Sequence, residues 1–185
     1  MADVCATTSL PDSIGSSRIQ NAARYDDYDE AEAVLPDALM TETLGEDQME
    51  ALAFYSEQGF SINKALYQGD EVSDVVAMRM AQIDEAVKRG TFEEDTVLWR
   101  SLAVDTPQSP GSVIQADGYT STTPILGDAQ IYSDENFHGT GGQLVQIIAP
   151  AGTNAQWVSY DWAEVLLPRG SRFRVIREGL WEVIP

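Results

Sequence analysis

The chain has 185 residues, 43% of them hydrophobic, and this length suits one globular domain with its own core. It carries 30 acidic against 11 basic residues and a formal net charge of −19, which disfavours nucleic-acid binding because attraction to phosphate needs a basic surface. The single cysteine, Cys5, excludes an intrachain disulfide, and with His138 as the only histidine we expect no metal site.

Residues 1–45 form a polar and acidic leader. Through Glu50, twelve acidic residues stand against Arg18 and Arg24. One interpretation is a solvated, partly disordered segment, and the other is a partner-binding or regulatory arm. The N-terminus has no apolar signal core, and no run in the chain approaches the ~20 apolar residues of a membrane span. We therefore expect a soluble protein without a signal peptide or a membrane partner, while an export route that needs no signal stays open.

Residues 46–96 are predicted to be helical. Apolar residues recur at helical spacing in two segments, 49–53 and 76–87, with Ser73 as the N-cap of the second segment and Gly90 as its stop. Between them, residues 59–66 predict a turn followed by a short helix. The methionine and aromatic positions of this region are interpreted as core.

The rest of the chain is rich in β-prone segments that Gly, Pro or Asp mostly separate. They cover residues 96–104, 118–122, 144–148, 157–160, 163–167, 172–176 and 180–184. Helices first and strands afterwards predict an α+β fold, not alternating βαβ units.

Three polar residues stand on separate β-prone segments. Arg100 lies in an apolar strand, where it is either a structural ion-pair partner or a fork for phosphate oxygens. Ser121 lies in a run of Ser and Thr residues. The run reflects either the β-propensity of threonine or a functional role, in which the Ser121 hydroxyl orients a carboxylate or a ribose. Glu164 stands at the head of a strand, as a polar strand end or as a carboxylate that stabilises positive charge at a sugar carbon.

The sequence lacks the common motifs of nucleotide-binding folds and of serine hydrolases. No glycine-rich sequence follows a strand and opens a helix, so neither a Rossmann nor a P-loop site is indicated. Nothing around His138 resembles the nucleophile elbow of a serine hydrolase.

Taken in order, these segments resemble the Arg-Ser-Glu class of mono-ADP-ribosyltransferases, which includes bacterial exoenzyme toxins and transferases of T-even phages. The resemblance covers residues 47–178. Residues 53–66 resemble the family's helical lobe, with Tyr55, then Ile62 and Asn63, then Leu66. Three further segments resemble its arginine strand, its Ser-Thr-Ser strand with Thr123 as the last residue, and its glutamate strand: 95–102, 118–123 and 161–171.

The resemblance implies a helical lobe followed by a split β-sandwich that holds NAD as substrate, in an ADP-ribosyltransferase domain of residues 46–185. Arg100 would bind the phosphate and ribose region, and Ser121 would place Glu164 to bond the nicotinamide ribose 2′-hydroxyl. Further candidates for NAD contact are Trp99, Tyr119, Thr122 and, in a loop of residues 124–142, Phe137. Candidates for acceptor binding, in a loop of residues 152–162, are Tyr160, Asp161 and Trp162.

The resemblance further implies transfer of ADP-ribose from NAD to a host macromolecule, with release of nicotinamide. A protein acceptor in a host-cell cytoplasm is expected ahead of a nucleic acid, with delivery by a phage or by signal-less export. Arginine-modifying members carry a glutamate two residues before the catalytic one, and Trp162 stands there instead. An indole is no base, so arginine is not the expected acceptor. Two alternatives are an NAD glycohydrolase and a non-catalytic binding module on the same fold.

Overall fold

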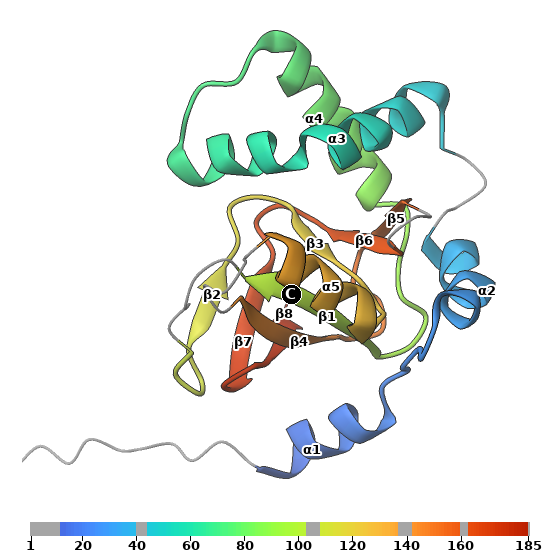
Figure 1. The fold of residues 1–185 in the computed structure, drawn as a ribbon, viewed down its shortest axis with the longest axis vertical. Coiled ribbons are helices and arrows are strands. Elements are labelled where there is room, and N and C mark those ends of the chain that lie inside the picture. The colour runs from blue at the N-terminus through green and yellow to red at the C-terminus, as the bar shows by residue number, and fades with distance from the viewer. Residues whose placement is uncertain (1–11, 40–43, 103–107, 137–141, 160–162, 185) are drawn as a thin grey trace, which may run out of the picture.

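The structure, a computed structural model, describes residues 12–39, 44–102, 108–136, 142–159 and 163–184. Four helices precede the strands: α1 (Asp12–Asn21), α2 (Tyr28–Leu39), α3 (Glu46–Gln68) and α4 (Asp74–Val87). Two β-sheets follow, as Figure 1 shows, and the predicted α+β class is confirmed. Within the described ranges, no helix combines the length and the apolar character that a membrane crossing requires.

The larger sheet has five strands. Their order is β1 (Thr96–Leu102), β4 (Gln143–Ala149), β8 (Leu180–Ile184), β7 (Arg172–Arg177) and β2 (Val113–Gln115), and only β4 and β8 run parallel. The smaller sheet is antiparallel, in the order β3 (Thr120–Thr122), β6 (Glu164–Leu167) and β5 (Gln156–Ser159). This is the split arrangement that the family resemblance implies.

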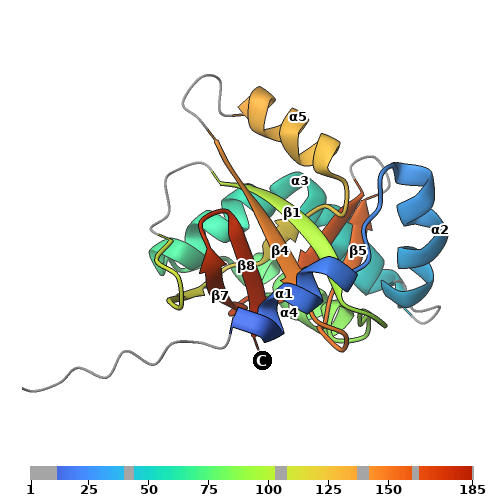
Figure 2. The same cartoon turned by 90° about the horizontal axis from the view of Figure 1, so that it is seen from below.

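Strand alternation divides the buried residues between two main cores. Val165 and Leu167 of the small sheet pack with Leu98 of the large sheet in the core between the sheets. Leu166 faces the other way and joins a second core beneath α3 and α4. The helical lobe, α3 and α4, therefore covers the outer face of the small sheet (Figure 1), while α1 lies against the far side of the large sheet (Figure 2).

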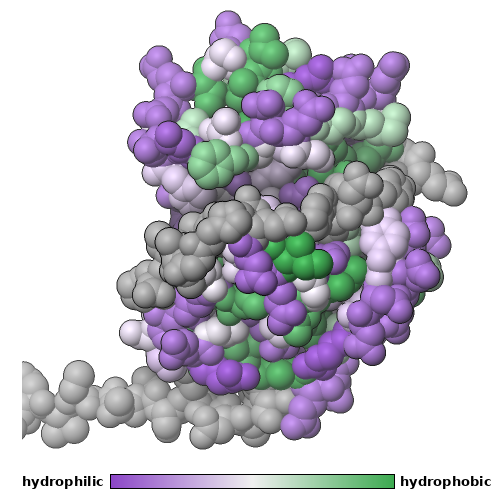
Figure 3. All heavy atoms as spheres, viewed as in Figure 1, coloured by the Kyte–Doolittle hydropathy of each residue, from purple (hydrophilic) through white to green (hydrophobic). Residues whose placement is uncertain are grey.

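Helix α3 is continuous through Gly59, which corrects the predicted turn and short second helix. Glycine lowers helix propensity by about 1 kcal/mol, but packing of one helix face outweighs this. The prediction that the methionine and aromatic positions are core is also only partly right. Met49 and Phe60 are 53% and 82% exposed, and the lobe surface mixes apolar and hydrophilic side chains (Figure 3).

After the helical lobe, two elements have no counterpart in the prediction, the short strand β2 and helix α5 (Leu126–Asn136). Helix α5 packs against β1 and β4, within a segment expected to be a loop. Its buried residues include Ala129 and Ser133, which are small and produce a weak apolar pattern. A helix that packs through small side chains is hard to predict from hydrophobic periodicity.

The acidic leader is partly folded. Its described residues form α1 and α2, and α2 contacts β5. The leader residues Tyr25, Ala31, Leu35 and Leu39 belong to the core between the sheets, and the ring of Tyr28 meets Trp157 edge-on at 6.3 Å. The boundary at residue 45 remains a prediction, but residues 12–39 are not a disordered segment, because a few well-placed apolar residues are enough to dock them.

Candidate functional site

The two sheets meet at a backbone bridge between β1 and the residue after β3. The N–H of Trp99 donates to the carbonyl of Thr123 at 2.7 Å, and the reverse bond is 2.9 Å. This antiparallel bridge brings the next residue of β1, Arg100, alongside β3. The guanidinium Nη1 of Arg100 then donates to the carbonyl oxygen of Ser121 at 2.7 Å. An arginine of the large sheet is thereby fixed against the small one.

The guanidinium of Arg100 has no carboxylate within 4.0 Å among the residues that the structure describes. A structural ion pair was one interpretation of this arginine, and the described part of the chain does not supply one. The bond to Ser121 occupies one nitrogen of a group with five N–H donors. The remaining donors can form the bidentate contact that phosphate oxygens favour.

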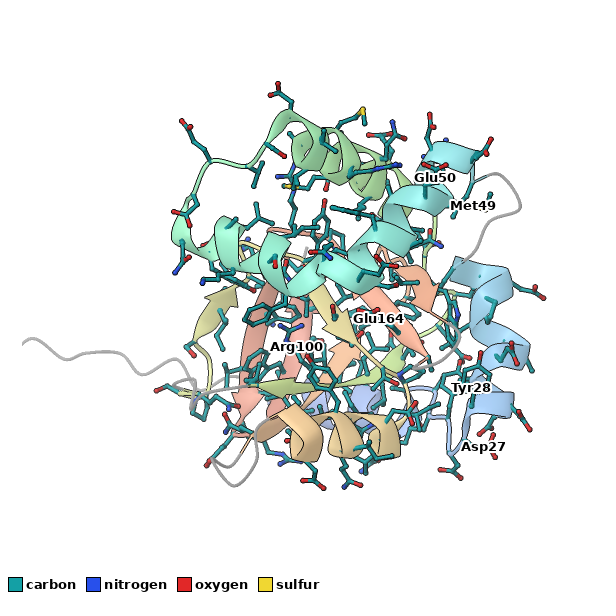
Figure 4. All side chains as sticks on the ribbon, turned by 45° about the horizontal axis from the view of Figure 1, so that its top comes forward. Asp27, Tyr28, Met49, Glu50, Arg100 and Glu164 are labelled. Carbon is teal, nitrogen blue, oxygen red and sulfur yellow. The ribbon has the colours of Figure 1, made fainter. Side chains whose placement is uncertain are left out.

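Glu164 opens β6 and faces the helical lobe. Ser121 of β3 pairs with Leu166 of β6, so alternation puts Glu164, Leu166 and Ser121 on one side of the small sheet. Burial raises the pKa of the Glu164 carboxyl, while a hydrogen bond from Ser121 and the charge of Arg100 oppose that rise. Figure 4 shows Glu164 and Arg100 in the same region below α3. A perturbed carboxylate near a guanidinium that has no carboxylate partner among the described residues is typical of functional sites.

Ser121 also connects this region to the helical lobe. The Tyr55 hydroxyl lies 3.0 Å from Ser121 Oγ, and Asn63 Nδ2 donates to that tyrosine oxygen at 3.0 Å. Burial is the main cause that raises the pKa of Tyr55 to about 12, so it stays protonated. The predicted site residues did not include Tyr55 or Asn63. The sequence feature that could have identified Tyr55 and Asn63 is the order Tyr, then Ile-Asn, in the segment that resembles the family's helical lobe.

The side chains of three residues expected to contact NAD lie elsewhere. Trp99 alternates with Arg100 and packs on the opposite face of the large sheet, near Val97 and α1. Tyr119 is completely buried, and its hydroxyl donates to Asp84 at 2.7 Å.

The hydroxyl of Thr122 donates to the Val165 carbonyl at 2.7 Å, inside the small sheet. Of the three side chains, Tyr119 thus bonds the helical lobe, Thr122 bonds the neighbouring strand, and Trp99 packs toward α1. The other expected contacts, Phe137, Tyr160, Asp161 and Trp162, lie outside the described residues. In the part of the chain that is described, no three His, Cys, Asp or Glu side chains gather as metal ligands would.

Comparison with solved structures identifies the fold. The chain superposes on Plx2a, an ADP-ribosyltransferase toxin from Paenibacillus larvae, with a TM-score of 0.71 and 16% identity, over 89% of this chain and 99% of that one. The Clostridium limosum C3 exoenzyme gives 0.69 and 18%, over 90% and 97%. C3stau2 from Staphylococcus aureus gives 0.68 and 16%, over 88% and 97%. The chain has the ADP-ribosyltransferase fold.

The match is one of structure, since no protein-family model and no curated protein sequence matches the chain. At 16–18% identity, it establishes the architecture and leaves the chemistry to the residues of the site. Nearly the whole length of each toxin chain is covered, so the helical lobe and both sheets are shared. Arg100, Ser121 and Glu164 come from β1, β3 and β6 of this ADP-ribosyltransferase fold, and Ser121 bonds Arg100 and shares a face of the small sheet with Glu164.

Proposed function

We propose that the chain is an NAD-dependent mono-ADP-ribosyltransferase that transfers ADP-ribose to a host protein and releases nicotinamide. One observation carries the proposal. Ser121 connects an arginine and a glutamate from different sheets: its carbonyl accepts a hydrogen bond from Arg100, and its side chain lies on the same face of the small sheet as Glu164. Similar structures were solved with NAD, with NADH and with carba-NAD: C3stau2, Clostridium perfringens BECa, and Pseudomonas aeruginosa exoenzyme S in complex with human 14-3-3 protein beta.

The chemistry follows from the two charged groups. Arg100 holds the NAD phosphates, and Glu164 accepts a hydrogen bond from the 2′-hydroxyl of the nicotinamide ribose. As the bond from C1′ to the nicotinamide nitrogen breaks, its electron pair leaves with nicotinamide and the ribose becomes oxocarbenium-like. The carboxylate of Glu164 stabilises this positive charge, and partial burial strengthens the effect. The acceptor then bonds to C1′ and loses its proton.

The acceptor is not proposed to be a simple arginine side chain. This rests on the sequence, in which Trp162 stands where a glutamate would hold and deprotonate a guanidinium. The same residue favours a second candidate function, hydrolysis of NAD, because water needs no binding site built for an arginine.

The test is incubation of the protein with NAD labelled on the adenylate phosphate, with and without a host-cell lysate. Label on a protein together with free nicotinamide supports transfer, and free ADP-ribose alone supports hydrolysis. Glu164→Gln should lower nicotinamide release by about 100-fold or more. The matched control is Glu178→Gln, an exposed carboxylate in the turn between β7 and β8, which should release nicotinamide normally. NAD that stays intact with the unmodified protein would leave only a binding module.

A further inference from the structure

The side chain of Asn63 pairs with both backbone groups of one residue. Its Oδ1 accepts the N–H of Tyr119 at 2.9 Å, and its Nδ2 donates to the Tyr119 carbonyl at 3.0 Å. A reversed amide would place donor against donor and acceptor against acceptor, so the backbone fixes its orientation. Gly118 permits the approach, because a Cβ there would lie only 2.6 Å from Asn63 Oδ1.

This fixed amide sets the direction of the next hydrogen bond. The second Nδ2 hydrogen of Asn63 points to the Tyr55 oxygen, at 3.0 Å. Tyr55 therefore accepts from Asn63 and sends its own single proton to Ser121 Oγ, also at 3.0 Å. The opposite direction would leave the buried Tyr55 proton without an acceptor among the described residues, at a cost of about 1–3 kcal/mol.

The donor and acceptor directions set by Asn63 and Tyr55 also determine which hydrogen faces the Glu164 carboxylate. Since Ser121 Oγ accepts from Tyr55, its hydroxyl proton is left for Glu164, which lies on the same face of the small sheet, two residues before Leu166, the residue paired with Ser121. We propose that Asn63 and Tyr55 are positioning residues that hold the Ser121 hydroxyl as a donor to Glu164. The inference rests on the proposed function, in which Glu164 must be ionised when NAD binds.

The effect of this order is to favour the charged carboxylate. Among the described residues, the ionisable groups that act on Glu164 are Arg100 from β1 and Tyr55 from α3, and Ser121 from β3 adds a neutral donor. Burial raises the pKa of Glu164, and the Ser121 proton works against this together with the Arg100 charge. A change at Asn63 on α3 that reverses these hydrogen bonds should therefore alter the pKa of Glu164 through Tyr55 and Ser121.

Asn63→Asp reverses the chain, because a carboxylate accepts from Tyr55 and cannot donate to it. Ser121 then donates to Tyr55, and Glu164 loses its donor. The pKa of Glu164 should rise by about one unit, which is the scale of a lost charge-assisted hydrogen bond. The measurement is a ¹³C NMR titration of labelled glutamate in the NAD-free protein, with the Glu164 signal identified by its loss in Glu164→Gln.

The new charge also acts directly on Glu164, so the comparison is made in a Tyr55→Phe background. That variant keeps the ring, which packs edge-on to Tyr119 at 5.4 Å, and removes the hydroxyl that transmits the reversal. The rise in the Glu164 pKa caused by Asn63→Asp should be at least twice as large with Tyr55 as with Phe at this position. Equal shifts in both backgrounds would overturn the proposal.

If Asn63→Asp does not fold, Asn63→Ala removes the donor without adding charge. It should give a smaller rise in the Glu164 pKa that again depends on Tyr55, and no rise would overturn the proposal. The NMR titration does not depend on NAD turnover. The proposed function and the proposed role of Asn63 and Tyr55 can therefore be contradicted independently of each other. A shift without NAD cleavage contradicts the proposed function, whereas cleavage by the parent protein without a shift contradicts the proton order.

Discussion

The ring of Tyr55 lies against Gly59, one turn later on α3. A Cβ added at Gly59 would lie 3.0 Å from Tyr55 Cζ and 3.1–3.2 Å from the two Cε atoms, which is tighter than side chains normally pack. Tyr55 is only 2% exposed and is held through its hydroxyl by Ser121 and Asn63. The glycine thus makes room for the ring that connects the helical lobe to the site.

Gly59→Ala should lower both stability and turnover. Alanine gains about 1 kcal/mol of helix propensity, but the Tyr55 ring cannot move away without breaking its bonds. Overpacking of this kind typically costs about 1–3 kcal/mol. Thermal unfolding and nicotinamide release measure the two effects. Gly127→Ala in α5 is the control, because a Cβ there meets nothing within 4 Å. It should leave turnover unchanged and raise stability by at most about 1 kcal/mol, the gain in helix propensity. A Gly59→Ala protein of raised stability and full activity would contradict the packing argument.

The sequence predicts the strands well because their signal is local. Alternation and β-propensity place Arg100, Ser121 and Glu164 on three strands, and the structure brings these strands together. The same alternation, applied strictly, would have removed two expected NAD contacts. Trp99 must face away from Arg100, and Thr122 must face away from Ser121.

Other features depend on partners far along the chain and have no local signal. The sequence predicts Tyr119 as an ordinary aromatic residue of a strand. Its hydroxyl, however, donates a hydrogen bond to Asp84 on α4, and Asp84 also forms an ion pair with Arg169 at 2.6 Å. A glycine in a helical segment usually indicates a break, and only the ring of Tyr55 explains Gly59. Contacts of this kind are set by tertiary packing, which overrides propensity.

Arg100→Lys should weaken NAD binding more than it weakens the fold. Lysine keeps the charge and can still donate to the Ser121 carbonyl, but it loses the planar fork that suits phosphate oxygens. We expect NAD affinity to fall by about tenfold or more, equivalent to one charge-assisted hydrogen bond, with little change in melting temperature. Calorimetric titration with NAD measures this. The exposed Arg172→Lys on β7 should bind NAD normally. A large loss of stability with normal NAD affinity would instead make Arg100 a structural residue.

The Glu164 carboxyl should make the protein less stable as the pH rises. Its folded pKa lies above the usual value of 4.5 because of burial, so the native state binds more protons than the unfolded state between the two pKa values. The contribution of Glu164 to stability is therefore greatest below pH 4.5, and it is lost as the pH rises through the folded pKa. Glu164→Gln removes this dependence.

The melting temperature of Glu164→Gln relative to the parent should consequently increase as the pH rises above about 4.5. Scanning calorimetry across this range measures the difference. Glu178→Gln, at an exposed position, should show none. A constant difference for Glu164→Gln would mean that burial does not perturb this carboxyl.

Leu35→Ala tests whether the acidic leader is part of the folded core. Leu35 on α2 is 2% exposed and packs in the core between the sheets, whereas its neighbour Val34 is 48% exposed. Truncation of a buried leucine costs about 2–5 kcal/mol, while exposed positions change stability by less than about 0.5 kcal/mol. Urea unfolding of Leu35→Ala and Val34→Ala compares the two on the same helix. Similar small losses would mean that the leader is separable, and NAD cleavage should then survive removal of residues 1–40. A large loss at Leu35 alone would show that the leader completes the core, because the inner face of the β-sandwich needs α2 to exclude water.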